Sequence, residues 1–97
     1  MYEIVTTELF TKWLDKLKDT KAKISIARRI ERMSIGLFGD NKFIGDGISE
    51  LRIDTGAGYR AYYTIDNGRI IILLIGGDKS TQSRDILKAK ELKKELK

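Results

Sequence analysis

The residues of this chain that could do chemistry are concentrated in two short stretches, residues 58–63 (GYRAYY) and residues 76–80 (GGDKS). Alternation along a strand would place Arg60 and Tyr62 on one face, and Tyr59 and Tyr63 on the other. A cation beside an aromatic ring on a sheet face is suited to meeting a phosphate. We therefore predict that Arg60 and Tyr62 lie on a cationic surface and Tyr63 in the core. The alternative is the solvated outer face of an antiparallel sheet.

The chain contains neither histidine nor cysteine, which narrows the chemistry it can perform. Proton transfer is left to Asp, Glu, Lys, Tyr, Ser and Thr, and a transition-metal site is not expected. Residues 77–81 (GDKST) resemble the end of a phosphate-binding loop, but that motif needs glycine where this chain has Asp78 and Leu73. We therefore predict no nucleotide cofactor, no other cofactor and no metal.

Two carboxylates share a strand face with cations. Glu50 and Asp54 alternate with Arg52, and Arg60 is expected on an adjacent strand. Opposite charges on neighbouring strands attract each other, so we interpret these carboxylates as partners in cross-strand ion pairs and not as an acid–base pair.

Length and composition predict one compact domain spanning residues 1–97. The chain has 97 residues, no proline and 41% hydrophobic residues, with a net charge of +5. Residues 20–35 and residues 79–97 each carry a net charge of +4, against −1 for residues 1–19 and −2 for residues 36–78. Clustered positive charge favours an anionic partner, with solvated helix faces as the alternative.

No signal peptide is visible and the longest apolar run, residues 70–75, is too short for a bilayer, so we expect a cytoplasmic protein without a membrane partner.

Hydrophobic periodicity predicts an α+β fold in the order β-α-α-β-β-β-α. The expected strands span residues 2–6, 48–54, 59–65 and 70–75, and the expected helices span residues 8–18, 20–35 and about 80–96. Thr7 should cap the first helix, and Ser80 or Thr81 the last. Asn67-Gly68 predicts a two-residue hairpin turn, whereas residues 37–47 are interpreted as a loop.

The expected helices present apolar residues on one side and cations on the other. Trp13 belongs to the apolar stripe of the first helix, so we place it in the core. The residues expected to point inward are Ile26, Ala27, Ile30 and Met33 in the second helix, and Ile86, Ala89, Leu92 and Leu96 in the last. The cations expected outside are Arg28, Arg29 and Arg32 in the second helix, and Lys88, Lys90, Lys93, Lys94 and Lys97 in the last.

Several of these stretches together resemble a known family, the small toxins of the RelE/ParE superfamily. The stretches are Trp13, residues 29–32 (RIER), residues 39–42 (GDNK), residues 45–47 (GDG), residues 50–52 (ELR), residues 58–63 (GYRAYY), and residues 76–82 (GGDKSTQ) with Asp85 and Ile86. They are most similar to the phage-derived, HigB-like "addiction module killer protein" branch, and the resemblance covers nearly the whole chain. It implies an antiparallel sheet with two N-terminal helices packed on one face, and a C-terminal helix.

The resemblance also implies a function. Such a protein is the toxin of a type II toxin–antitoxin system, neutralised by a cognate antitoxin. It would be a metal-independent endoribonuclease that cuts messenger RNA on the ribosome, by attack of a ribose 2′-hydroxyl on the adjacent phosphate. Arg60 matches the family's phosphate-contacting arginine, Lys79 lies near the position of a second cation, and Arg52 is a weaker match. Face alternation adds Tyr62 as a residue that stacks on or hydrogen-bonds a splayed base, and Arg28 and Arg32 are further candidates for substrate binding.

The chain also departs from the best-characterised ribonucleases of this family. Those proteins place lysines on the strand before the Gly-Tyr-Arg block and a tyrosine in the last helix, where this chain has Arg52, Ile86 and Leu87. The general base is therefore unassigned. Two other functions stay open: a non-enzymatic, ParE-like gyrase-poisoning toxin, and a degenerate member that binds its antitoxin without activity.

Overall fold

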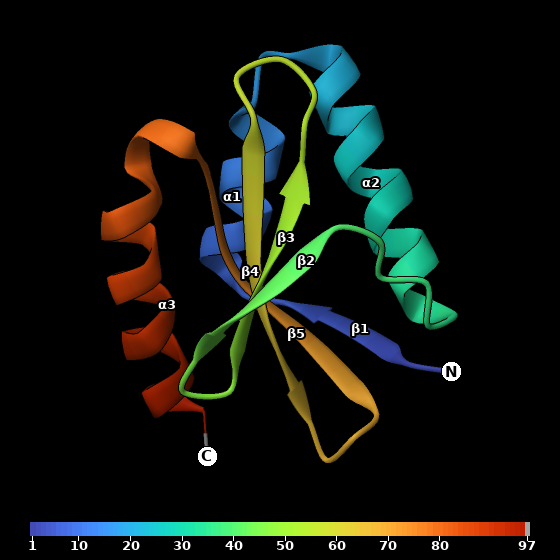
Figure 1. Ribbon diagram of the computed structural model, residues 1–97, viewed down its shortest axis with the longest axis vertical. Helices are drawn as coiled ribbons and strands as arrows, with labels where there is room; N and C mark the ends of the chain where they lie inside the picture. The colour runs from blue at the N-terminus through green and yellow to red at the C-terminus, as the bar shows by residue number, and fades with distance from the viewer. Residues whose placement is uncertain (97) are drawn as a thin grey trace.

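A five-stranded sheet in the order β1-β5-β4-β3-β2 forms the centre of the protein (Figure 1). The computed structural model describes residues 1–96, so Lys97 lies outside the described residues. The elements are β1 (Glu3–Thr6), α1 (Glu8–Lys16), α2 (Thr20–Ser34), β2 (Asn41–Gly45), β3 (Ile48–Ile53), β4 (Tyr59–Asp66), β5 (Ile70–Asp78), a 3₁₀ turn η1 (Lys79–Thr81) and α3 (Gln82–Glu95). The α+β class predicted from the sequence is confirmed.

The sheet differs from the predicted one at its two edges. The stretch interpreted as a loop contains β2, which pairs antiparallel with β3. This strand is short, and Lys42 and Phe43 on it are exposed, so it lacks the alternation of a half-buried strand. At the other edge β1 runs parallel to β5, whereas β2 to β5 are antiparallel.

The helices cover both faces of the sheet. The larger apolar core lies between the sheet and helices α1 and α2, and contains Phe10, Ile26 and Tyr63, with Trp13 packed against it. A smaller core between the sheet and α3 contains Tyr62 and Ala89. In Figure 1, α2 and α3 lie on opposite sides of the sheet.

Two predictions of inward-pointing apolar residues, Ala27 and Leu96, are wrong. Ala27 is exposed on α2, whereas Ala22, one turn before the buried Ile26, is buried. Leu96 lies beyond the end of α3 and is exposed. Tyr63 is buried in the larger core, as predicted, and Trp13 is partly buried and packs against that core.

The helix starts follow side-chain capping. The Thr7 hydroxyl accepts a hydrogen bond from the Phe10 N–H at 3.1 Å, as predicted. Asp78 caps the 3₁₀ turn η1 that precedes the last helix: its carboxylate accepts from the Ser80 N–H at 2.8 Å, and its own N–H donates to Thr81 Oγ1 at 3.3 Å. Thr81 occupies the cap position of α3, as predicted, but its side chain makes no capping hydrogen bond. The chain therefore turns directly from β5 into η1 and α3.

Gly76 and Gly77 allow helices to approach β5 closely from both faces. A Cβ atom on Gly76 would overlap the indole ring of Trp13 in α1, and one on Gly77 would overlap Asp85 and Thr81. These two glycines are therefore required by packing.

We predict that Gly76→Ala lowers the free energy of unfolding by about 1–3 kcal/mol, because the added methyl group must displace the indole ring. Urea unfolding followed by circular dichroism measures this loss. Combining Gly76→Ala with Trp13→Leu should recover part of it, since the bulky ring is then absent. A Gly76→Ala protein as stable as the parent would contradict this account of the packing.

Candidate functional site

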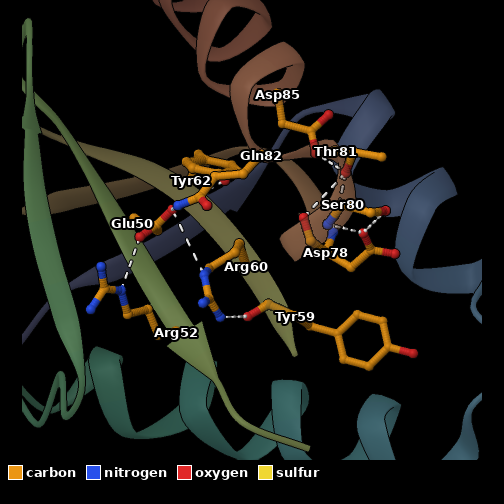
Figure 2. Close-up of polar contacts among 10 residues, drawn as sticks. All are labelled: Glu50, Arg52, Tyr59, Arg60, Tyr62, Asp78, Ser80, Thr81, Gln82 and Asp85. Carbon is orange, nitrogen blue, oxygen red and sulfur yellow. Dashed lines mark hydrogen bonds and ion pairs between the residues drawn. The ribbon is translucent and has the colours of Figure 1, made fainter. Parts of the chain in front are cut away.

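Glu50 is a buried carboxylate on β3, on the face of the sheet that α3 covers (Figure 2). One carboxylate oxygen accepts a hydrogen bond from Arg52 Nε at 3.0 Å. The other accepts from the Tyr62 hydroxyl at 3.2 Å and from Gln82 Nε2 at 2.5 Å. We call these residues and Arg60 the Glu50 cluster; its members come from β3, β4 and α3.

Arg60 lies directly opposite Arg52 on the neighbouring strand. Its Nε is 3.8 Å from the Glu50 carboxylate, and its terminal nitrogen donates to the Tyr59 carbonyl at 3.1 Å. Among residues 1–96, Arg60 Nε is the buried side-chain nitrogen or oxygen atom that lacks a hydrogen-bond partner. Two like charges in register would repel each other, and the carboxylate of Glu50 offsets this repulsion.

The prediction that Arg60 lies on an open cationic surface is wrong. Its side chain is only 8% exposed, against 33% for Arg52. α3 covers this face of the sheet, because Gln82 is hydrogen-bonded to Glu50. Asp85 of the same helix is buried close to Gly77, and Gly77 is the residue of β5 that pairs with Arg60. The predicted cross-strand ion pairing of Glu50 is confirmed.

Tyr62 is also buried, which excludes in this conformation the base-stacking role predicted for it. Burial raises the pKa of its hydroxyl, and the nearby Glu50 carboxylate raises it further. The hydroxyl therefore stays protonated near neutral pH and donates to Glu50. It does not act as a general base.

The raised pKa of Tyr62 predicts how the free energy of unfolding changes with pH in alkaline solution. The pKa of a tyrosine hydroxyl is near 10 in an unfolded chain, and that of Tyr62 is higher in the folded protein. This difference contributes to the free energy of unfolding in full below about pH 10, and the contribution is lost as the pH rises above that value. We expect Tyr62→Phe to lower the free energy of unfolding by about 1 kcal/mol near neutral pH, through the lost hydrogen bond. Its stability should then fall less than the parent's between about pH 9 and pH 11. Urea titrations across this range measure both effects, and equal slopes for the two proteins would contradict the assignment.

Lys79, the first residue of η1, is exposed at the end of β5. Its N–H donates to the Gly58 carbonyl at 3.1 Å, and its aliphatic chain lies over Gly58. Because Gly58 is two residues before Arg60, Lys79 lies near the end of the strands that carry Arg52 and Arg60. No hydrogen bond or ion pair within residues 1–96 links it to the Glu50 cluster.

The structure separates Arg28 and Arg32 from the Glu50 cluster. Both are exposed on α2, which packs on the other face of the sheet, and they help to line a hollow of about 330 Å³. Arg29, between them, donates to the carbonyls of Arg52 at 2.6 Å, Phe38 at 2.9 Å and Asp40 at 3.0 Å. It therefore holds together the backbone on both sides of β2.

A second polar group flanks the cluster where α3 begins. Asp85 is buried and accepts from the Thr81 hydroxyl at 2.5 Å. Asp78 accepts from the hydroxyl of Ser80 at 2.5 Å, and this hydrogen bond lowers the pKa of Asp78. Gln82 and Asp85 were missed as site residues. Their spacing could have indicated them, because residues 82, 85 and 89 lie on one face of a helix. In this protein that face is turned to the sheet.

Residues 12–96 match the family described as "Phage derived protein Gp49-like (DUF891)". A protein of Haemophilus influenzae is 55% identical over 94 residues, which cover 97% of this chain and 95% of that protein.

Two solved structures of Escherichia coli proteins are similar in fold. A RelE toxin variant in the free state is 18% identical with a TM-score of 0.72, over 99% of this chain and 98% of that one. A chain of the intact RelBE toxin–antitoxin complex is 19% identical with a TM-score of 0.62, over 80% of this chain and 96% of that one. At these identities the similarity shows a common fold.

Proposed function

Because the chain belongs to the phage-derived Gp49-like family (DUF891) and has the fold of the RelE toxins, we propose that it is the toxin of a type II toxin–antitoxin system. We assign it to the HigB-like branch of the RelE/ParE superfamily, with messenger RNA cleaved on the ribosome as its activity. Its partners are then a cognate antitoxin, the ribosome and messenger RNA, in the cytoplasm. Within residues 1–96, no helix has the length and apolar character needed to cross a membrane.

The proposal rests on two arginines that the pairing of β3 with β4 places opposite each other, with one buried carboxylate beside both. Glu50 fixes Arg52 through a hydrogen bond that also raises the pKa of the guanidinium. Arg60 Nε lies 3.8 Å from Glu50 but donates no hydrogen bond to any group among residues 1–96. Positioned cationic donors stabilise a phosphoryl group as negative charge builds up on its oxygens. Lys79, at the same end of the sheet, would add a third cation.

The proposed reaction is an internal transfer at phosphorus. The ribose 2′-oxygen forms a bond to the adjacent phosphorus, and the bond from phosphorus to the 5′-oxygen of the next nucleotide breaks. The proton leaves the 2′-hydroxyl, the departing 5′-oxygen gains one, and the upstream fragment ends in a 2′,3′-cyclic phosphate. Tyr62 is not the base, so positioning by the ribosome and charge stabilisation by the arginines supply most of the acceleration.

The burial of Arg60 sets a condition on this proposal. Gln82, in the first turn of α3, is hydrogen-bonded to the carboxylate beside Arg60. Arg52, which is one-third exposed, therefore meets the phosphate first. The first turn of α3 must then move aside for Arg60 to complete the contact.

The same burial favours a second candidate function. Glu50 offsets one of the two arginine charges, and the buried carboxylate of Asp85 flanks the cluster. The Glu50 cluster and Asp85 together therefore carry no net formal charge. A cluster of this kind suits a non-enzymatic toxin that acts by binding, such as a ParE-like gyrase poison. It also suits a member that binds an antitoxin without activity.

Inducing the chain in bacterial cells and mapping transcript ends distinguishes these functions. The proposed ribonuclease gives codon-linked cuts in translated messages and none in untranslated copies of them. DNA-damage signalling without such cuts would identify the gyrase-directed toxin, and unaffected growth would identify the inactive member.

A further inference from the structure

A hollow of about 500 Å³ lies between α1 and α3, beside Ile75 and Gly76 near the end of β5. Trp13 and Ile75, both partly buried, give it an apolar floor, and Leu9 lies beside them with 42% of its surface exposed. We call this hollow the α1–α3 groove. It shares α3 with the Glu50 cluster but is lined by other residues of that helix: the cluster uses Gln82, whereas Arg84, Asp85 and Lys88 line the groove.

The rim of the groove is strongly cationic. Lys12 and Lys16 from α1 and Arg84 and Lys88 from α3 line it. The carboxylate that also lines it, Asp85, is buried and engaged by the Thr81 hydroxyl. The groove therefore combines an apolar floor with an excess of positive charge on both sides.

The rim cations are available to a partner. Lys12 is 2.8 Å from Glu8, and Lys88 is 4.0 Å from Glu91, but both pairs are solvent-exposed. Exposed pairs of this kind contribute about 0–1 kcal/mol, so carboxylates of a partner could replace them at little cost.

We propose that the α1–α3 groove binds an amphipathic helix of a partner protein, with apolar side chains on one face and carboxylates flanking them. An apolar face would cover Leu9, Trp13 and Ile75, as in other complexes where a helix lies in a groove. The flanking carboxylates would pair with Lys12 and Lys16 on one side and with Arg84 and Lys88 on the other. Charge complementarity of this kind speeds association and selects the partner.

Two other occupants fit the groove less well. For a nucleic acid, the platform would be Trp13, but its ring already packs against Phe10 and Tyr59, with ring centroids 5.6 Å and 6.3 Å away. For a second copy of this chain, two cationic rims would face each other across a symmetric contact. The proposed helix does not rest on ribonuclease activity, because its binding is measured without RNA.

Synthetic peptides test the proposal with the purified full chain. The probe is a helical peptide of about 18 residues with Leu at i, i+3, i+4 and i+7 spacing and Glu on the flanks. One control replaces Glu by Lys, and another replaces Leu by Ser. Trp13 is the one tryptophan of the chain, so its fluorescence reports on the groove directly. We expect the acidic peptide to shift Trp13 emission to the blue and to bind at least about tenfold more tightly than either control.

Charge reversal at exposed rim positions completes the test. Arg84→Glu with Lys88→Glu should weaken binding of the acidic peptide at least about tenfold, whereas Lys94→Glu, exposed elsewhere near the end of α3, should change it little. Equal binding of the acidic and basic peptides, or indifference to the rim reversal, would overturn the proposal. A larger Trp13 response to an oligouridine, or to a rise in protein concentration alone, would overturn it in favour of RNA or of a second copy.

Discussion

Arg60→Ala is expected to lower cleavage of messenger RNA on translating ribosomes by about 10²-fold or more. On the proposed mechanism, the guanidinium stabilises charge that develops on the phosphoryl oxygens. Removing one such donor from an enzyme typically costs about 10²–10³ in rate. Primer extension on a defined message, with purified ribosomes and purified protein, measures the loss.

Two controls separate chemistry from folding. Arg60→Ala leaves the buried Glu50 carboxylate with fewer cationic partners, so the variant should also be less stable. The double variant Arg60→Ala with Glu50→Gln removes both charges, and should recover stability without recovering cleavage. Arg69→Ala, at an exposed arginine in the β4–β5 turn, should cleave like the parent. Cleavage by a folded Arg60→Ala protein at the parental rate would remove Arg60 from the mechanism.

Glu50→Ala is expected to lower the free energy of unfolding by about 3–5 kcal/mol, the usual cost of removing one partner of a buried ion pair. The carboxylate accepts hydrogen bonds from Arg52, Tyr62 and Gln82, and it lies 3.8 Å from Arg60 Nε. Its loss leaves the buried Arg60 guanidinium without its ion-pair partner and frees the first turn of α3. Urea unfolding monitored by far-ultraviolet circular dichroism gives the value.

The exposed ion pair of α1 provides the matched control. Glu8 contacts Lys12 one helical turn away in solvent, so Glu8→Ala should change stability by only about 0.5 kcal/mol. Glu50→Gln keeps the shape of the side chain, and its loss of stability should lie between those of Glu50→Ala and Glu8→Ala. If Glu50→Ala costs no more than Glu8→Ala, the cluster does not hold β3, β4 and α3 together.

The elements with strong local signals were predictable from the sequence. Apolar stripes at helical spacing indicated α1 and α2, and the predicted cap at Thr7 is present. Asn67 and Gly68 both have positive φ, as the predicted turn requires. The strand β2 was missed because an exposed edge strand buries too little to show alternation. The parallel pairing of β1 with β5 depends on the tertiary path of the chain, which a local pattern does not encode.

Of the candidate site residues, Arg52, Arg60 and Tyr62 lie together in the Glu50 cluster, but the burial of Arg60 and Tyr62 was not predicted. Alternation correctly grouped Arg60 and Tyr62 on one face and Tyr63 on the other, and the Glu50 ion pairs were expected. Alternation gives the face of a strand, but not what covers that face. The polar side of α3, Gln82 and Asp85, packs onto it and buries Arg60 and Tyr62. A helix with many lysines gives little sign that Gln82 and Asp85 on its inner side cover a charged cluster.

The most direct test of the proposed function is the chemistry of the cut ends. Purified protein is incubated with ribosomes stalled on a defined message, and the 3′ end of the upstream fragment is identified by mass spectrometry. The account predicts a 2′,3′-cyclic phosphate, or the phosphate left by its hydrolysis, because the attacking oxygen belongs to the ribose itself. An upstream fragment ending in a 3′-hydroxyl, or a message left intact on the ribosome, would contradict it.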